Sequence, residues 1–328
     1  MSTPTRRSQH PLIRRPHRHK VLITGIGGNL GRAVARRLHR TCEVIGVDRR
    51  PVEHMPADVE IERVDIRRRR AEDIFRRHQL DAVIHLNIMH DPRSPQAQHH
   101  DFNISGTQKI FNLCAAHNVP KIIVLSSANV YGPSERNDQF LKEDAPLMGG
   151  QNFEAIRDLI ALDMFCNTSF WKFPEIETVI LRPAHIIGRV RNAPSRYLQL
   201  ERPVTLMGFD PMVQLIHVED VVSGIELALT PGLRGIYNLA GPSPVPLSYI
   251  FERLGRRPRP LPEPLARAAL RTAWSLKLSD WPEPEIDHIK YVCMVDDALA
   301  RAELRFSPRY DLDAILREIE RERMLASF

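Results

Sequence analysis

Short apolar runs of strand length alternate with helical patterns through the first half of the chain. Between the first two runs, for example, Leu30, Val34 and Leu38 recur at the spacing of one helix face. Because the runs are almost continuously apolar, both faces of each strand should be buried, as in a parallel sheet with helices on both sides. The predicted strands are Lys20–Thr24, Glu43–Val47, Glu60–Val64, Ala82–Leu86, Lys121–Leu125 and Thr178–Leu181.

The pattern changes after Pro183, where prolines become frequent and apolar runs become short and irregular. This change predicts a smaller C-terminal lobe that closes a cleft over the strand ends, where doubly wound sheets bind their ligands. We therefore predict an α/β fold with a doubly wound parallel (Rossmann) sheet and a smaller C-terminal substrate lobe. Its expected parts are a flexible leader at 1–19, a Rossmann domain at 20–182, and a lobe at 183–328, from which about 214–240 returns to the Rossmann core.

Helical patterns complete this prediction. The segment Leu265–Leu278 is amphipathic, with arginine and lysine on its polar side. We interpret it as packed on the core; contact with a lipid surface or with a partner helix is the alternative. The other predicted helices are Ile104–Ala116, Glu219–Leu229, Leu312–Met324 and one whose apolar side is Phe153, Ile156, Ile160 and Met164.

The net charge of +6 lies entirely within residues 1–20. Residues 1–20 carry six arginine or lysine side chains and no carboxylate, so residues 21–328 sum to zero. A neutral body argues against a nucleic-acid-binding fold. No apolar run is long enough to span a membrane. The four scattered cysteines fit a reducing compartment, so a cytoplasmic location is expected.

A glycine-rich turn, Thr24-Gly-Ile-Gly-Gly-Asn-Leu-Gly31, follows the first predicted strand and opens the first helix. Gly25, Gly28 and Gly31 have the spacing that permits a tight turn, close approach of a pyrophosphate, and packing of helix on strand. The pyrophosphate would lie at the helix N-terminus, where free N–H groups and the helix dipole favour negative charge. The turn therefore predicts the binding of a dinucleotide.

Asp48, at the end of the second strand, favours NAD over NADP, because a carboxylate accepts hydrogen bonds from the ribose hydroxyls and repels a 2′-phosphate. Arg49 and Arg50 follow at once and are able to reach such a phosphate, so NADP stays the less favoured alternative. Asp65 ends the third strand, where it either touches the adenine end of the cofactor or caps a turn.

Further motifs follow the glycine turn in order along the chain: Val64-Asp65, His85-Leu86, Asn103 with Gly106-Thr107, Ser126-Ser127-Ala-Asn-Val-Tyr131-Gly132, Leu181-Arg182-Pro183 and Ile216-His217-Val218-Glu219-Asp220-Val221. Together they resemble the extended short-chain dehydrogenase/reductases, the NAD-dependent epimerase/dehydratase family, over about residues 20–230. The resemblance implies a nicotinamide dinucleotide and hydride transfer from a nucleotide-sugar carbon. It also implies a catalytic Ser or Thr, a Tyr, and a Lys four residues after the Tyr.

That tyrosine–lysine pair is missing. Ser127 matches the family's serine, but none of the six tyrosines is followed four residues later by a lysine. The helix register places Phe153 and Arg157 where the family has Tyr and Lys. Phenylalanine exchanges no proton, and a guanidinium does not replace a compact ammonium. Ala128 and Asn129 stand where dehydratases of the family carry an acidic pair, so dehydration is disfavoured.

Four histidines and an aspartate gather between residues 85 and 100. They either supply a replacement base or belong to a polar loop beside the cofactor. They lack the ligand spacing of a helical HxxxH motif, so no metal site is predicted. His217 is expected to cap the helix that follows it.

A complete dinucleotide site without the Tyr and Lys favours a cofactor-binding sensor or a degenerate family member. The alternative is an active epimerase or oxidoreductase on a nucleotide sugar or related substrate, with Ser127, Tyr131 or a loop histidine as base. The expected partners are NAD and a nucleotide-sugar-like small molecule, with no nucleic acid; a homodimer stays open. The residues expected to bind the cofactor are Gly25, Gly28, Asn29, Leu30, Gly31, Asp48, Arg49, Asp65, Ile66, Leu86 and Arg157.

The leader is predicted to contribute nothing to folding. Deletion of residues 1–19 should leave both the melting temperature and the affinity for NAD unchanged. Calorimetry of the full and the truncated chain measures both quantities. A large drop in melting temperature would mean that the folded part begins before residue 20.

Overall fold

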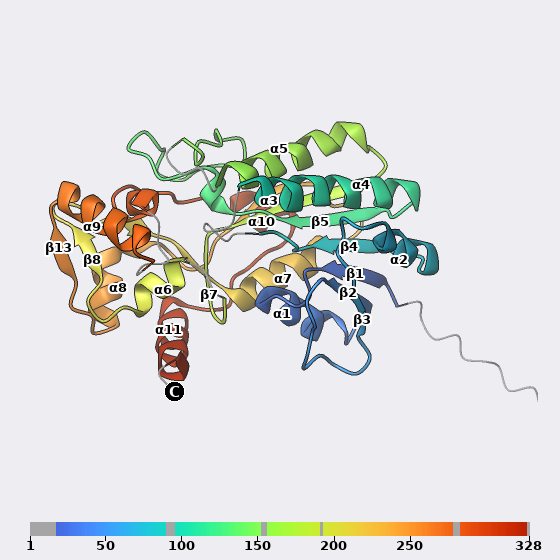
Figure 1. Ribbon diagram of the computed structural model, residues 1–328, viewed down its shortest axis with the longest axis horizontal. Coiled ribbons are helices and arrows are strands. Elements are labelled where there is room, and N and C mark those ends of the chain that lie inside the picture. Colours follow the sequence, from blue (N-terminus) through green and yellow to red (C-terminus); the bar gives the residue numbers. More distant parts are fainter. Residues whose placement is uncertain (1–17, 90–95, 152–155, 191–192, 278–282, 327–328) are drawn as a thin grey trace, which may run out of the picture.

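The computed structural model describes residues 18–89, 96–151, 156–190, 193–277 and 283–326. Its centre is a seven-stranded sheet in the order β11-β6-β5-β4-β1-β2-β3, and every neighbouring pair of strands is parallel (Figure 1). The strand order reverses between β1 and β4, which confirms the predicted doubly wound sheet. The strands are β1 (Lys20–Thr24), β2 (Glu43–Asp48), β3 (Glu60–Arg63), β4 (Ala82–His85), β5 (Lys121–Leu125), β6 (Glu177–Pro183) and β11 (Gly235–Leu239).

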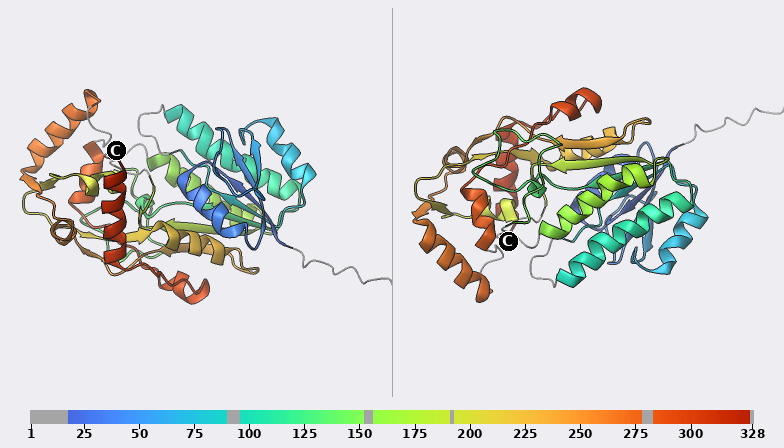
Figure 2. Two further views of the ribbon diagram at one scale, coloured as in Figure 1. Left: turned by 90° about the horizontal axis from the view of Figure 1, so that it is seen from below. Right: turned by 90° about the horizontal axis from the view of Figure 1, so that it is seen from above.

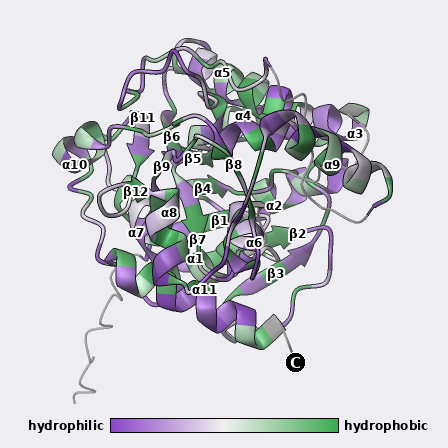
Figure 3. Cartoon of the chain, turned by 90° about the vertical axis from the view of Figure 1, so that its left-hand side faces the viewer, coloured by the Kyte–Doolittle hydropathy of each residue, from purple (hydrophilic) through white to green (hydrophobic). Residues whose placement is uncertain are grey.

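Helices cover both faces of the sheet, and the central strands carry hydrophobic residues (Figure 3). Successive side chains of a strand point to opposite faces, so Val21 and Ile23 of β1 join one apolar core and Leu22 joins the other. This double burial explains the continuous apolar runs in the sequence. The covering helices are α1 (Asn29–Leu38) and α7 (Val218–Ala228) on one face, and α2 (Glu72–Arg77), α4 (Gly106–Ala116) and α5 (Arg157–Lys172) on the other (Figure 2).

Short elements complete this part of the molecule. A π-helical turn leads directly into α4. The helix predicted to begin at Ile104 therefore starts within this π-helical turn and becomes α-helical at Gly106. The short elements are η1 (Arg69–Ala71), α3 (Gln96–His100), the π-helical turn η2 (Asp101–Ser105) and η3 (Ala128–Val130).

The C-terminal lobe has an apolar core of its own, which includes Tyr197, Phe251 and Ile315. After β11 the chain returns once more to the Rossmann core, because Ala300 and Phe306 pack in the cluster on the α1 face. The remaining elements are β7 (His185–Ile187), α6 (Ala193–Gln199), β8 (Val204–Leu206), β9 (Met212–Val213), β10 (Leu215–His217), β12 (Val245–Pro246), α8 (Leu247–Arg253), β13 (Arg259–Leu261), α9 (Glu263–Ser275), η5 (Glu283–Ile289), α10 (Ala298–Glu303) and α11 (Leu312–Ala326).

The cysteines form no disulfide. Cys42, Cys114 and Cys166 are buried, and Cys293 is partly exposed. Their thiols therefore pack as small apolar groups, which agrees with their scattered positions in the sequence. None of the helices that the structure describes combines the length and the apolar character that a membrane span requires.

The predicted apolar side of helix α5 is confirmed at Ile156 and Ile160, which pack in or against the core, but not at Met164. The helix begins at Arg157, and Met164, predicted on the apolar side, is 56% exposed. Asp163 lies inside instead, with no exposed surface. The prediction was wrong for Met164 because hydrophobic spacing places every carboxylate outside, whereas Asp163 is the partner of the buried Arg182. Phe153, the first residue of the predicted apolar side, lies outside the described residues.

The segment Leu265–Leu278 packs on the core of the lobe by a narrow face, with Ala266 in the apolar cluster and Leu270 against it, while Leu265 and Leu276 are exposed. Within α9 only Ala266 is fully buried, while Leu265 is 60% exposed. Leu276, just beyond the last turn, is 62% exposed. Ion pairs from Arg267 to Glu283 and Asp287 add to this attachment to η5.

A buried ion pair joins α5 to the neighbouring strand β6. The Arg182 guanidinium makes two hydrogen bonds to the Asp163 carboxylate, of 2.5 and 2.9 Å, and the two side chains are 2% and 0% exposed. Ser126, which follows β5, donates its hydroxyl proton to the same carboxylate at 2.6 Å. Because a buried charge that loses its partner is costly, this pair fixes α5 against the strand ends.

The substitution Arg182→Met should lower the free energy of unfolding by ~3–5 kcal/mol, because it leaves Asp163 buried without a counter-charge. The matched control is Arg253→Met, which breaks an ion pair with Asp313 of the same 2.5 Å length whose side chains are 46% and 53% exposed. That exposed pair should be worth less than ~1 kcal/mol. Urea unfolding measures both losses, and equal losses would contradict the role given to the buried pair.

Candidate functional site

The turn between β1 and α1 requires glycine because of its backbone conformation and its close backbone contacts. Gly25 has a φ of +76°, and a Cβ placed there would lie 2.9 Å from the Cα of Asn87. A Cβ at Gly31 would collide with the Gly25 carbonyl oxygen. Helix α1 begins at Asn29 with Gly28 as its N-cap, and no side chain hydrogen-bonds at that cap. The N–H groups of the first turn are therefore available to an anion.

Asp48 is held against this turn. Its carboxylate accepts hydrogen bonds from the Gly27 N–H at 3.1 Å and from the Arg50 N–H at 2.9 Å. A Cβ at Gly27 would lie 2.8 Å from the same carboxylate, so only glycine permits this approach. The carboxylate thus stands beside the turn, where the sequence predicts the ribose hydroxyls of the cofactor.

Two arginines contact the Phe102 ring beside β2 and β3. The guanidinium carbons of Arg49 and Arg67 lie 5.3 and 5.2 Å from the ring centroid. Arg67 also binds Asp65 at 2.6 Å, and this hydrogen bond lowers the pKa of the Asp65 carboxyl. The Arg67 N–H donates to Asp65 as well, so the turn-capping alternative describes Asp65 in this structure. Adenine contacts of Asp65 and of the buried Ile66 stay predictions.

His85 is a structural residue, and the hypothesis that it is a replacement base is wrong. Its ring is fully buried between the hydroxyls of Thr24 and Thr107, at 2.7 and 2.9 Å. Burial lowers the pKa of His85 to about 4. The next residue, Leu86, donates its N–H to the Thr24 carbonyl at 3.1 Å, which continues the β1–β4 pairing toward the glycine turn.

The other described histidines of that region, His99 and His100, are adjacent in α3 but have different surroundings. His90 and Asp91 lie outside the described residues. His99 is 3% exposed, and the Nδ1 atom of His100 lies 3.5 Å from the Asp158 carboxylate. The structure therefore shows no histidine cluster in the described part of residues 85–100.

His217 is the helix cap that its sequence predicts. Its Nδ1 atom accepts the Glu219 N–H at 3.2 Å at the start of α7. Its ring stacks on Tyr310 with 3.7 Å between the centroids. These contacts give His217 a structural role between α7 and the lobe.

Ser127 lies in the loop that follows β5. Its Oγ atom accepts the Asn129 N–H at 3.2 Å and so caps η3. Backbone hydrogen bonds of 3.0 and 3.1 Å join residues 130–131 of this loop to residues 148–149. The loop is thereby fixed beside the chain segment that leads into α5.

Tyr131, from the same loop, is not the exposed base that the sequence left open. Its phenol donates to the Asn238 side chain at 2.8 Å and accepts a hydrogen bond from Arg182 at 2.7 Å. The residue is 1% exposed, and burial raises the pKa of the phenol to about 12. It therefore extends the Arg182–Asp163 network into β11. Sequence spacing alone gives no sign of this network, because its members are 19 to 107 positions apart.

A pocket lies between the Ser127 loop and the C-terminal lobe. Three segments line it, and its polar side chains on the lobe side are Asp287 and His288 of η5. Sequence reasoning missed both, because no spacing pattern ties η5 to a loop so far away along the chain. The lining residues are Asn129, Tyr131, Gly132, Pro133 and Ser134; Met148, Gly149, Gln151 and Ile156; and Pro284, Asp287 and His288.

The model of the NAD dependent epimerase/dehydratase family matches residues 21–240, which is two thirds of the chain. The chain belongs to this family. An uncharacterised protein of Mycobacterium tuberculosis is 27% identical over 316 residues, covering 92% of this chain and 82% of that protein. The short-chain dehydrogenase/reductase family 42E member 1 of Xenopus laevis is 27% identical over 63% of this chain and 58% of its own length.

Solved epimerases of low sequence identity share the fold. The UDP-glucose 4-epimerase of Thermotoga maritima, solved with UDP-glucose, has a TM-score of 0.71 at 20% identity and covers 94% of this chain and 99% of its own. The UDP-glucuronic acid 4-epimerase of Bacillus cereus, solved with UDP-glucuronic acid and NAD, has a TM-score of 0.70 at 17% identity. It covers 93% of this chain and 100% of its own. The Rossmann sheet and the lobe thus both have counterparts in the epimerase fold.

Arg157 is the residue that the sequence predicts at the position of the family's lysine. It opens α5 with an exposed side chain, and its Nε atom donates to the Gly150 carbonyl at 3.0 Å. Phe153, in the register of the family tyrosine, lies outside the described residues. The positions of both side chains relative to a bound ribose stay predictions.

Asp48→Asn should erase the preference for NAD over NADP, because it removes the charge that repels a 2′-phosphate but keeps an oxygen for the Gly27 N–H. Charge-assisted hydrogen bonds from the ribose hydroxyls to the carboxylate are worth ~1.5–3 kcal/mol. The affinity for NAD should therefore also fall, by the factor that this loss of binding free energy corresponds to. Asp73→Ala, on the exposed α2 surface, is the control. Calorimetric titration of both cofactors gives the result, and tighter binding of NADP to the unmodified protein would contradict the prediction.

Proposed function

We propose that this chain binds NAD and a nucleotide-sugar-like ligand but lacks the ordinary oxidoreductase chemistry of its family, as a sensor or a degenerate member. One combination carries the proposal: a complete glycine turn holds Asp48, while no tyrosine in the chain precedes a lysine at the family spacing. Proteins of the same fold, including the UDP-glucose 4-epimerase of Thermus thermophilus, were solved with NAD, which supports the choice of cofactor.

The residues of the turn fit a dinucleotide. The close approaches at Gly25 and Gly31 leave the backbone bare, which lets a pyrophosphate come near the N-terminus of α1. The N–H groups of Asn29 and Leu30 would bind its oxygens, and Asp48 would accept the ribose hydroxyls. When bound, NAD supplies an acceptor for hydride; the protein must remove the proton of the same hydroxyl group.

Neither the phenol nor the imidazole in the described pocket lining has a pKa that suits removal of that proton. The Tyr131 phenol is engaged by Arg182, and its raised pKa keeps it protonated at neutral pH. Burial, together with the neighbouring His185, lowers the pKa of His288 to about 3, so its imidazole is a weak base. General bases work best when their pKa lies near the working pH, and neither group meets that condition.

An active epimerase or oxidoreductase with a different base is the second candidate. Ser127 favours it, because this hydroxyl is partly exposed at the family's serine position and its loop borders the pocket. Such an enzyme would have to use a base other than His85 or Tyr131, because both side chains are buried in structural hydrogen bonds.

The double substitution Phe153→Tyr with Arg157→Lys should create or raise NAD-dependent oxidation of a nucleotide sugar. A positioned acid/base group is worth ~10²–10⁴ in rate, and the two single variants, which restore half of the pair each, should gain less. The measurement is NADH formation with UDP-glucose and UDP-N-acetylglucosamine.

Titration of NAD and of UDP-glucose accompanies the rate measurement. Robust turnover by the unmodified protein would contradict the proposal in favour of the second candidate. A double variant that binds both ligands and stays inactive would show that the missing pair is not what limits the chemistry.

A further inference from the structure

Helix α9 carries an apolar stripe on the side that faces solvent. Its ion pairs to η5 lie on the other side, where Arg267 binds Glu283 and Asp287. Five exposed positions recur at the spacing of one helix face, and all but Thr272 are apolar. They are Leu265, Ala268, Ala269 and Thr272 in the helix, with Leu276 just beyond its last turn.

The turn after β8 extends this apolar surface at the N-terminal end of α9. Met207 and Phe209 in this turn are 57% and 40% exposed. The Met207 N–H donates to the carbonyl of Leu261 at 3.0 Å, two residues before α9 begins. The Phe209 ring lies 5.1 Å from the ammonium group of Lys290, which binds Glu263 in the first turn of the helix. We call Leu265, Leu276, Met207 and Phe209 the α9 surface.

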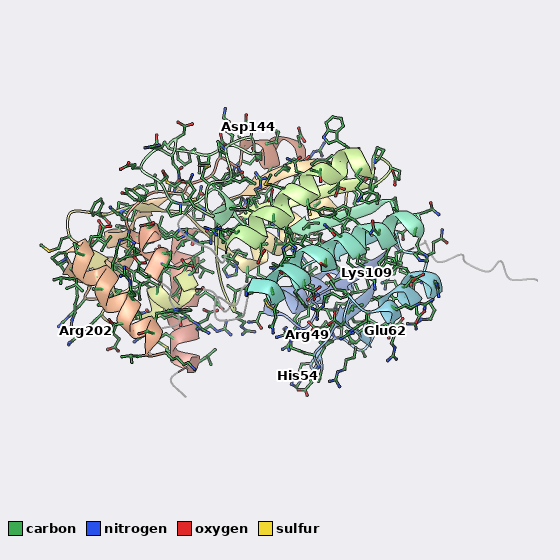
Figure 4. The ribbon with its side chains drawn as sticks, turned by 45° about the horizontal axis from the view of Figure 1, so that its top comes forward. Arg49, His54, Glu62, Lys109, Asp144 and Arg202 are labelled. Atoms are coloured by element: carbon green, nitrogen blue, oxygen red, sulfur yellow. The ribbon has the colours of Figure 1, made fainter. Side chains whose placement is uncertain are left out.

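Exposed arginines lie at the opposite end of the β8–β13 ribbon. The two strands pair in parallel, so their N-terminal ends lie side by side and Met207 follows the other end. Arg202, Arg257 and Arg259 are exposed at the N-terminal ends. Within the described part of the chain, none of these three side chains pairs with a carboxylate. Figure 4 shows Arg202 at the outer edge of the lobe, beside α9.

Helix α9 and the residue after Leu276 add two further exposed cations, Arg271 and Lys277. The Arg271 side chain is 72% exposed, and its guanidinium lies 4.0 Å from the Glu283 carboxylate, which Arg267 also binds. Such an exposed contact leaves the guanidinium accessible to another anion.

Carboxylates are fewer on the same part of the lobe. In 201–210 and 257–277, the exposed charged residues are the five cations named above and the two carboxylates Glu201 and Asp210. Glu201 pairs with Arg323 at 3.4 Å. Asp210 accepts hydrogen bonds from the N–H and the hydroxyl of Ser248, at 2.9 and 2.6 Å. The α9 surface is therefore bordered by more positive than negative charge.

The position of α9 in the molecule favours a flat partner. The helix lies with β8 and β13 at one end of the long axis of the molecule (Figure 1), and both views of Figure 2 show it on the outside. A projecting helix forms a ridge, and a protein partner would need a matching groove to bury it. A lipid interface accepts such a ridge without one, since the apolar side of a helix lies among the acyl chains there.

We propose that the α9 surface docks on an anionic lipid bilayer, with α9 lying in the plane of the interface. The apolar side chains would enter the boundary between headgroups and acyl chains, and the bordering arginines would meet the lipid phosphates. Contact with lipid would remove from water the large apolar side chains that the fold leaves exposed. The inference goes beyond the proposed function and does not depend on it.

The test is co-sedimentation of the full chain with lipid vesicles. Vesicles of phosphatidylcholine alone are compared with vesicles of phosphatidylcholine mixed with phosphatidylglycerol. The mixed vesicles should bind at least tenfold more tightly at low salt, because each arginine or lysine near an anionic surface contributes about fivefold. The difference should shrink at 1 M salt, where the Debye length is only about 3 Å.

Leu265→Ser with Leu276→Ser tests the apolar part of the surface. This pair should weaken binding to the mixed vesicles by about tenfold or more, because two leucines no longer leave water. Met164→Ser with Leu299→Ser is the matched control, since both residues are exposed on α5 and α10. The control should bind within about twofold of the unmodified protein.

Arg202→Glu with Arg257→Glu tests the charged border. This pair should lower the preference for the mixed vesicles by at least tenfold and leave binding to phosphatidylcholine unchanged. Arg69→Glu with Arg70→Glu makes the same change of net charge on the exposed η1 segment and should leave most of the preference in place. The basic residues 1–20 are present in every variant, so differences between variants come from the substituted side chains.

Melting temperatures check that all variants are folded, which is expected because every substituted residue is exposed. Failure of the unmodified protein to bind either vesicle would overturn the proposal, as would binding that the leucine pair does not weaken. A lipid-free dimer that the leucine pair dissociates, seen by sedimentation velocity, would assign the surface to a second copy instead. Each of these results leaves NAD binding, and with it the proposed function, untouched.

Discussion

The ion pair between Arg182 and Asp163 organises the end of the sheet at which the site forms. It ties α5 to β6, and Ser126 adds the end of β5 to the same carboxylate. Tyr131 carries the network on to Asn238 of β11. All of these groups are buried, so removing one leaves another without its partner. The loop that holds Ser127 and the first turn of α5 take their positions from this network.

The same network bears on the proposed lack of a tyrosine base. Arg182 uses the Tyr131 phenol as an acceptor, which removes the tyrosine of this loop from the pocket as a proton-transfer group. The glycine turn, by contrast, depends only on β1, α1 and the Asp48 contact, and it is complete. The proposed loss of catalysis would be compatible with dinucleotide binding, because the glycine turn and the pocket rest on different interactions.

Helix α9 is held in the lobe both by ion pairs and by a few apolar contacts. Its Arg267 binds Glu283 and Asp287 of η5, while Ala266 and Leu270 pack in the apolar cluster of the lobe. The segment η5 also brings His288 into the pocket lining. The ion pairs of α9 therefore help to position one wall of the pocket.

The sequence by itself determined the parallel sheet, the family, and a dinucleotide turn in which Gly25 lies 23 positions before Asp48. These features follow from strand periodicity and from residue types close together in the chain. Only the tertiary structure decided that Asp163 is buried, that Tyr131 is a structural hydrogen-bonding residue, and that His288 lines a pocket. Each of these depends on partners from distant segments, and local hydrophobic spacing carries no information about a buried charge whose partner lies on another strand.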